Sequence, residues 1–209
     1  MAGFKTHVAG GLIVGGCSAA IAFEVYHLDI IAAVSVFIMG TIGGLLPDLD
    51  SDTGKPLALL FGAVSILIPS LMLHKLPIAK EFSAEFLVSY FVISYLVINV
   101  IICNFIKKLT HHRGIFHSLP FAVLAGELGY LVFLPSGDTL AMLIATSLFT
   151  GSLVHLLLDE LNSLSFNYFI IPRIKGSFGT ALKLKSNSFI ATSTIYILIL
   201  AAAYIITTH

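Results

Sequence analysis

The stretch LPFAVLAGELGYLVFLPSGDTLAMLIATSLFTGSLVHLLL, residues 119–158, decides the fold class of this chain. It holds two long apolar runs, and the short polar break PSGD (residues 135–138) separates them. A helix needs about 20 mostly apolar residues to cross the hydrocarbon core of a bilayer. Two such runs joined by a tight polar break predict two antiparallel membrane-spanning helices.

The rest of the chain has the same apolar character. Its 209 residues are 57% hydrophobic and 11% charged, with a mean hydropathy of +1.01, whereas a soluble domain has roughly 25% charged residues. The formal net charge is zero, which gives no support to nucleic-acid binding, and we expect no nucleic-acid partner. Because no Pro-rich or Gly/Ser-rich linker interrupts the sequence, we expect one integral-membrane domain over residues 1–209.

Apolar runs of suitable length recur along the chain. We therefore predict an all-α fold, a polytopic transmembrane helix bundle of about seven spans. Glycines such as Gly40, Gly43 and Gly44 suit close packing between these helices. The expected spans are residues 8–25, 30–46, 57–73, 86–106, 119–134, 140–158 and 189–206.

Basic residues indicate the orientation of this bundle. If the side that holds Met1 is followed through seven alternating spans, nine of the eleven Lys and Arg residues lie on that side and two lie on the other. The positive-inside rule then makes the side of Met1 cytoplasmic. We expect a multi-pass protein with a cytoplasmic N-terminus.

The same alternation brings polar motifs together on the cytoplasmic face. It places five of the eight histidines and five of the eleven acidic residues there. Scattered loops would not sort metal-ligand residue types in this way, so the pattern predicts a metal site. The motifs are His7, LLPDLDSD (residues 45–52), HHRGIFHS (residues 111–118) and HLLLDELNS (residues 155–163).

Two of these motifs carry the strongest ligand pattern. His155 and Asp159 are four residues apart, so on a helix they project from the same face and can share one ion. Asp48 and Asp50 follow the helix-breaking Pro47, and close carboxylates repel one another unless a cation or a proton neutralises them. The alternatives are a His–Asp hydrogen bond at a helix end and a solvated loop. Mixed imidazole and carboxylate ligands suit zinc ahead of manganese and magnesium, as one or two ions.

The HHRGIFHS motif adds groups for chemistry on a phosphate ester. Arg113 offers a planar fork of donors that matches phosphoryl oxygens. His117 is a candidate ligand, and His112 or Glu160 is a candidate general base. Ser118 is placed to cap the next helix. We therefore expect a metal-dependent hydrolase in which His112, Arg113 and Glu160 are catalytic and the metal ligands are His7, Asp48, Asp50, His117, His155 and Asp159.

The ordered motifs LLPDLD, HRGIFHS and GSLVHLLLDELNS resemble those of the bacterial membrane-bound metal-dependent hydrolases of the YdjM type, also described as LexA-regulated. The resemblance runs from His7 to about Lys185 and implies an inner-membrane location. It carries over His7, Asp48, Asp50, His112, Arg113, His117, His155 and Asp159 as motif positions. The sequence departs from the family pattern at Phe116 and Asn162, where threonine is usual, and after Asp50, where Ser-Asp replaces the common His-Pro.

The substrate and two alternative functions follow from the same residues. The ligand pattern is loosely similar to that of zinc-dependent phospholipase C, which implies membrane lipids as partners and a lipid or small-molecule phosphate ester as substrate. A divalent-metal transporter or channel would need ionisable groups deep in several spans, and only Glu127 is placed so. A non-catalytic scaffold or regulator with a structural metal site would use the same ligands, without an open coordination position.

Overall fold

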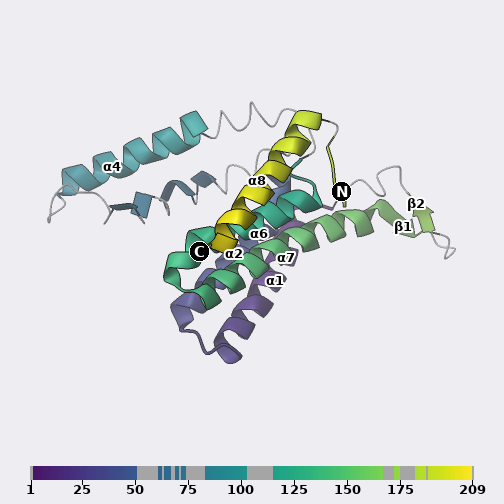
Figure 1. The fold of residues 1–209 in the computed structure, drawn as a ribbon, viewed down its shortest axis with the longest axis horizontal. Helices are drawn as coiled ribbons and strands as arrows, with labels where there is room; N and C mark the ends of the chain where they lie inside the picture. Colours follow the sequence, from purple (N-terminus) through teal and green to yellow (C-terminus); the bar gives the residue numbers. More distant parts are fainter. Residues whose placement is uncertain are drawn as a thin grey trace. The chain divides into compact units, whose positions relative to one another are not determined.

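The structure is a computed structural model that describes residues 2–50, 61–62, 64–66, 69–70, 72–73, 83–102, 115–166, 172–174, 182–186 and 188–208. The chain forms two compact units, one made of Met1–Asp48 with Gly114–His209 and the other of Leu49–Arg113. Within the described residues, the first unit holds five α-helices, the 3-10 helix η1 up to Asp48, a second 3-10 helix and two short strands (Figure 1). In chain order these are α1 (Phe4–Glu24), α2 (Ile30–Gly43), η1 (Leu46–Asp50), α6 (Leu119–Phe133), η3 (Leu134–Ser136), α7 (Asp138–Ser163), β1 (Leu164–Phe166), β2 (Pro172–Ile174) and α8 (Phe189–Thr208).

Local sequence signals start and end these helices. The side chain of Asp29 accepts a hydrogen bond from the Ala32 N–H at the start of α2, at 2.8 Å, which satisfies a donor that the helix leaves unpaired. Ser118 caps α6 in the same way, as predicted, by accepting from the Phe121 N–H at 3.3 Å. Gly137 separates η3 from α7 with a φ of 110°, a backbone conformation that a residue with a side chain rarely adopts.

Helices α1, α2 and α7 pack on one another, and small residues line their contacts. A methyl group added to Gly40 would lie 2.8 Å from the Cα of Gly15 on α1, and one added to Gly44 would lie 2.6 Å from the Cα of Gly11. The hydroxyl of Ser152 on α7 donates to the Gly43 carbonyl at 3.1 Å. Close backbone approach and hydrogen bonds between helices are the forces that hold membrane helices together. The prediction that Gly40, Gly43 and Gly44 serve close packing is confirmed.

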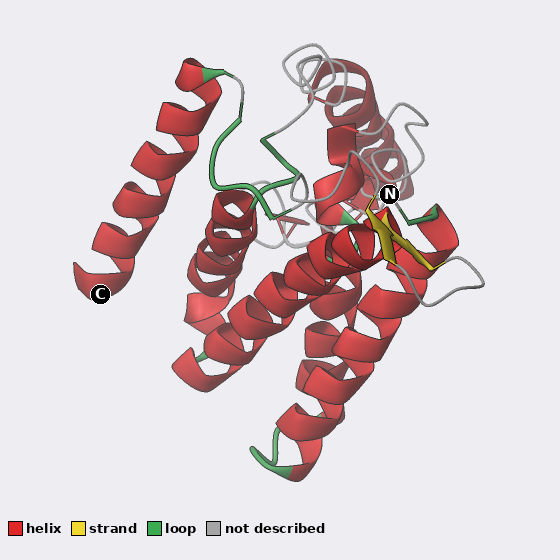
Figure 2. Cartoon of the chain, turned by 90° about the vertical axis from the view of Figure 1, so that its right-hand side faces the viewer, coloured by secondary structure: helices red, strands yellow, loops and turns green. Residues whose placement is uncertain are grey.

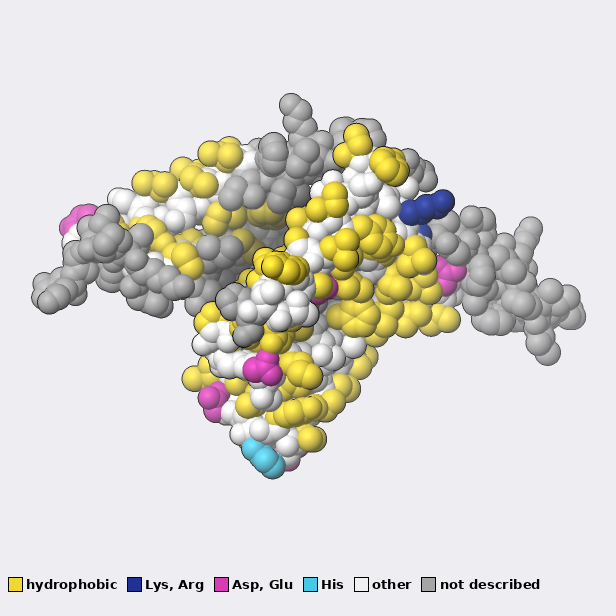
Figure 3. Space-filling view, in the orientation of Figure 1, with side chains coloured by type: hydrophobic (Ala, Val, Ile, Leu, Met, Phe, Trp, Pro, Cys, Tyr) yellow, Lys and Arg dark blue, Asp and Glu magenta, His cyan; other side chains and the backbone are white. Residues whose placement is uncertain are grey.

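The apolar core of this unit lies toward one end of the bundle. Ala22, Ala33, Val36 and Ile144 form it, near the end of α1 and the starts of α2 and α7. The outward surface is also apolar: hydrophobic side chains cover much of the described surface in Figure 3. Phe189 is 85% exposed and Ile31 is 76% exposed. Large apolar side chains that face outward on several helices are what a lipid environment requires.

The second unit contributes a helix of its own. Helix α4 (Ala84–Leu96) begins where the Ser83 hydroxyl accepts from the Phe86 N–H at 3.2 Å, and it continues as the π-helical segment η2 (Val97–Ile102). The side chain of Asn99 in η2 donates to the Tyr95 carbonyl. No residue of α4 is buried within the described part of this unit.

The fold class was predicted correctly, and the described residues hold fewer membrane-crossing helices than the seven spans that were expected. Within the described residues, five helices are long and apolar enough to cross a membrane, and α2 is a shorter apolar helix. The expected span over residues 57–73 lies largely outside the described residues. The short antiparallel pairing of β1 with β2, drawn in yellow in Figure 2, was not predicted. The single domain over residues 1–209 stays a prediction.

Candidate metal centre

Four separate segments bring five predicted ligands to one end of the bundle. His7 lies in the first turn of α1, and Asp48 lies on η1, just after α2 ends. His117 precedes the start of α6, while His155 and Asp159 lie in the last turns of α7. Because α1 and α6 begin where α2 and α7 end, these positions meet at one end, opposite the apolar core.

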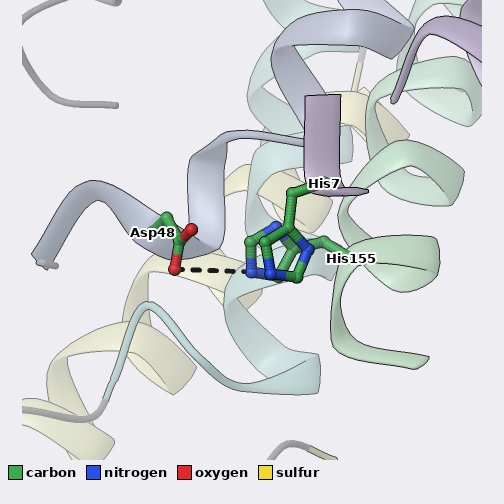
Figure 4. Close-up of side chains that lie close together, drawn as sticks. All are labelled: His7, Asp48 and His155. Atoms are coloured by element: carbon green, nitrogen blue, oxygen red, sulfur yellow. Dashed lines mark ion pairs between the residues drawn. The ribbon is translucent and has the colours of Figure 1, made fainter. Parts of the chain in front are cut away.

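His155 is the centre of the cluster. Its Nε2 atom lies 3.3 Å from Nε2 of His117 and 3.6 Å from Oδ1 of Asp48. The same nitrogen lies 3.9 Å from Oδ2 of Asp159. Figure 4 shows the Asp48 carboxylate directed at this imidazole from η1. Three side chains from three segments therefore face a single nitrogen atom.

A hydrogen bond on the far side of the ring fixes how His155 presents that nitrogen. Its Nδ1 atom lies 2.7 Å from the carbonyl oxygen of Gly44. A carbonyl only accepts, so Nδ1 carries the proton, and in a neutral imidazole Nε2 then offers a lone pair. Histidines that bind metals commonly donate their other N–H to a backbone carbonyl in this way. His155 is thus oriented as a metal ligand would be.

Asp159 is held at both carboxylate oxygens. Oδ1 accepts from the backbone N–H of Ala2 at 2.5 Å and lies 3.3 Å from Nε2 of His7. Oδ2 lies 2.9 Å from Nε2 of His117. Asp159 is only 3% exposed, and a buried carboxylate is tolerated where donors or a cation surround it.

His7 completes the cluster by stacking on His155. The two ring centroids are 3.6 Å apart and the planes differ by 15°. The two rings overlap in the view of Figure 4. The Nδ1 atom of His7 is buried and has no hydrogen-bond partner among the described residues. An orphaned polar nitrogen in a buried site is costly unless a further group satisfies it.

The charges of the cluster require neutralisation. Burial raises the pKa of Asp48, but the facing imidazoles of His155, His7 and His117 outweigh this when they are protonated, and the net pKa lies below the ordinary value. Asp48 and Asp159 are then both carboxylates in one largely buried site. Either protons on the imidazoles or one divalent cation can balance two negative charges.

The donor set fits a metal ion. Tetrahedral zinc with bonds of 2.0–2.1 Å places its ligand atoms about 3.3 Å apart, and the separations around His155 Nε2 lie between 3.3 and 3.9 Å. Two groups of candidate ligands share His155, and because its Nδ1 is hydrogen-bonded to the Gly44 carbonyl, both would use its Nε2. Among the described residues these groups are His7 with Asp48 and His155, and His117 with His155 and Asp159, each with ligand atoms within 4.8 Å of one another.

A comparison with known protein families identifies the chain. A family model described as YdjM inner membrane protein matches residues 1–208. The chain belongs to the YdjM inner membrane protein family. Together with the five long apolar helices, this membership makes the chain a membrane protein of the YdjM family. No curated protein and no solved structure matches it.

The other site residues predicted for this YdjM family member are placed less fully. Asp50 ends η1, two residues after Asp48, and its side chain lies outside the described residues, as do His112 and Arg113 entirely. Glu160 is half-buried on α7, directly after Asp159. Successive helix residues project about 100° apart, so Glu160 does not point in the direction of Asp159.

Two groups of the cluster were missed by the sequence analysis. The N–H of Ala2 and the carbonyl of Gly44 orient the two α7 ligands, Asp159 and His155 respectively. Both are backbone groups, and every residue carries such groups, so residue types give no signal for them. For Gly44, the nearest signal is the pair Gly43–Gly44 at the end of an apolar run, which predicts close approach by another helix.

Proposed function

We propose that this membrane protein is a metal-dependent hydrolase that cleaves a phosphate ester of a lipid at the membrane surface. The arrangement of His155 is the observation that carries the proposal. Its Nδ1 is tied to the Gly44 carbonyl, while its Nε2 faces two carboxylates and a second imidazole. A hydrogen bond at a helix end would need only one partner, whereas five converging imidazole and carboxylate side chains suit an ion.

The metal would be held by His7, Asp48, His117, His155 and Asp159, with zinc favoured over manganese and magnesium. Imidazole nitrogen suits zinc, and carboxylate oxygen suits zinc as well as the harder cations. Asp50 is a further candidate ligand. Asp48 has the most exposed side chain of the carboxylates and imidazoles that ion-pair here, at 15%. Substrate would therefore reach the site on the side of η1.

A divalent ion, when bound, supplies water activation at neutral pH and polarises a phosphoryl oxygen. The reaction adds water across the ester: the water oxygen bonds to phosphorus, the ester P–O bond breaks, and the alcohol leaves with a proton. Glu160 or His112 would take the proton from water and return it to the leaving oxygen. Arg113 would bind the phosphoryl oxygens and stabilise the charge that develops on them.

The position of the cluster supports a lipid substrate. It lies at the ends of α1, α2, α6 and α7, each an apolar helix, and so at the depth of lipid headgroups. The segment 182–186 is joined to this end, because the Leu119 N–H donates to the Lys183 carbonyl at 3.1 Å. The excess of basic residues on this side makes it the cytoplasmic face in our proposal.

Hydrolysis by metal-depleted and zinc-reconstituted protein tests the function. In detergent with a short-chain glycerophospholipid, we expect phosphate-ester cleavage only after reconstitution. Glu160→Gln should lower kcat by about 10²-fold or more, and Arg113→Lys should lower it by about 10²-fold. His27→Gln, a change in the turn between α1 and α2, should have no effect.

Two outcomes would contradict the proposal in favour of the alternatives. Metal flux across vesicles that contain the protein, without ester cleavage, would indicate a transporter. Stoichiometric metal with neither flux nor cleavage across a panel of phosphate esters would indicate a structural site that fastens the helix ends together.

A further inference from the structure

We propose that an apolar groove between α2, α6 and α7 holds an acyl chain of the substrate while its phosphate ester lies at the metal centre. This inference rests on the proposed function and names its substrate class: a lipid recognised by its alkyl chain. The groove has a volume of about 250 Å³, and all the residues that line it are apolar or glycine. Such a lining offers an alkyl chain contact without polar competition.

Two residues that line the groove are close in sequence to candidate metal ligands. Leu46 lines the groove and lies on η1, two residues before Asp48. Phe121 also lines it, and its N–H donates to Ser118, the neighbour of His117. A chain lying in the groove would therefore place its polar end beside two ligands of the proposed ion.

The length of the groove matches one leaflet of a bilayer. Its wall on α6 runs from Phe121 to Val132, and eleven residues of α-helix rise by about 16 Å. This is about half of the 30 Å hydrocarbon thickness of a bilayer. A lipid with its headgroup at the metal centre would extend its chain along the groove toward the middle of the membrane.

One wall of the groove is open to the hydrocarbon. Leu128 is 49% exposed and Val132 is 67% exposed, whereas Ala125 at the floor is only 5% exposed. A chain can therefore enter sideways from the leaflet without leaving the apolar phase. The small side chain of Ala125 sets the depth of the groove, and a larger one would fill it.

Chain-length dependence of hydrolysis tests the groove separately from the metal centre. The probes are diacyl glycerophospholipids with acyl chains of four to eight carbons, assayed as monomers with zinc-loaded protein. We expect kcat/KM to rise at least about tenfold across this series, because added methylenes in an apolar site discriminate strongly. Ala125→Leu should abolish this rise, because the larger side chain fills the groove that the longer acyl chains would occupy.

Two further variants keep the test decisive. Ala201→Leu makes the same change at an exposed position of α8 and should keep the chain-length dependence. Leu128→Phe narrows the groove from its exposed wall, where a larger side chain does not require the buried floor to repack. This variant should lose the chain-length dependence, as Ala125→Leu does. Retained zinc shows in each case that the bundle has folded.

Each remaining result is informative. If kcat/KM does not depend on acyl-chain length in the wild type, the groove proposal is wrong but the hydrolase proposal stands. The same holds if both groove variants keep the chain-length dependence of the wild type. If no ester is cleaved, the proposed function fails. The groove is then tested by a benzophenone side chain at position 128: a lipid adduct that Ala125→Leu diminishes would support it. An adduct to this chain or a second copy in place of lipid would overturn it.

Discussion

At the residue scale, His155 links the packing of the helices to the chemistry of the site. Its Nδ1–H donates to the Gly44 carbonyl at the end of α2, so Nε2 is the ring nitrogen that faces the other candidate ligands. A buried imidazole is satisfied by one hydrogen-bond partner at each ring nitrogen. His155 instead has three ligand-type atoms within 4 Å of its second nitrogen.

The role of His7 can be separated from its packing. His7→Phe keeps an aromatic ring that can stack on His155, where the centroids are now 3.6 Å apart, but it removes both ring nitrogens. We expect the affinity for zinc to fall by at least the roughly 10–100-fold that the loss of a partner behind a ligand costs, measured by competition with a chromophoric chelator. The Tm of the metal-free protein should fall as well, because the buried Asp159 loses the imidazole that faces its Oδ1. A variant that binds zinc as tightly as the wild type would exclude His7 as a ligand.

The side chains of the cluster could be predicted from the sequence, but their orientation could not. His7, Asp48, His117, His155 and Asp159 belong to motifs that alternate spans sort to one face, and the structure brings all five together. The groups that orient them, the Ala2 N–H and the Gly44 carbonyl, are backbone atoms fixed by tertiary packing. No residue type identifies such atoms in advance.

At the scale of elements, the glycine contacts between α2 and α7 set the position of the α7 ligands. Gly151 faces α2 so closely that a methyl group there would lie 3.0 Å from the Gly44 nitrogen and would also strike the Gly40 carbonyl. His155 is one turn farther along α7. The hydrogen bond from His155 to Gly44 therefore depends on this close packing.

Gly151→Ala should loosen both the fold and the site. Overpacking of a close helix contact costs about 1–3 kcal/mol, and the shift of α7 should weaken zinc binding as well. Thermal unfolding in detergent and zinc titration measure the two effects. Gly16→Ala is the matched control, because a methyl group on Gly16 meets nothing within 4 Å. If the two variants have the same Tm and the same zinc affinity, the α2–α7 contact does not control the site.

The elements themselves were only partly readable from the sequence. The apolar runs predicted α6, α7 and α8 to within about five residues at each end, because each run is bounded by polar or helix-breaking residues. The run after Ile30 was expected to span to residue 46, but α2 ends at Gly43 and the chain turns into η1. This change of direction, together with Pro47, carries Asp48 toward His155. Hydropathy does not distinguish such a turn from one more helical turn.

At the scale of the whole molecule, the two ends of the helix bundle differ, because the candidate metal ligands all lie at one end. Asp29, His27 and Ser136 lie at the ends of α1, α2 and α6 opposite the metal centre. We propose that the metal-centre end is cytoplasmic, because basic residues are concentrated on that side of the sequence-based topology.

Cysteine accessibility in intact cells tests this orientation. Cys17 and Cys103 are first replaced by serine, and single cysteines are then introduced as Ser136→Cys or Lys185→Cys, both at exposed positions. A membrane-impermeant maleimide should label position 136 in intact cells and position 185 only after permeabilisation. The reverse pattern would place the metal centre on the outer face.

Metal content is the most direct test of the central claim, that residues from separate helices form one metal site. Elemental mass spectrometry would compare the detergent-purified wild type with Asp48→Asn, His155→Gln and the control His27→Gln. The account predicts stoichiometric metal, with zinc favoured, in the wild type and the control, and its loss from both site variants, because η1 and α7 share one ion. No bound metal in the wild type after loading with Zn²⁺, Mn²⁺ or Mg²⁺, or metal retained by both site variants, would contradict it.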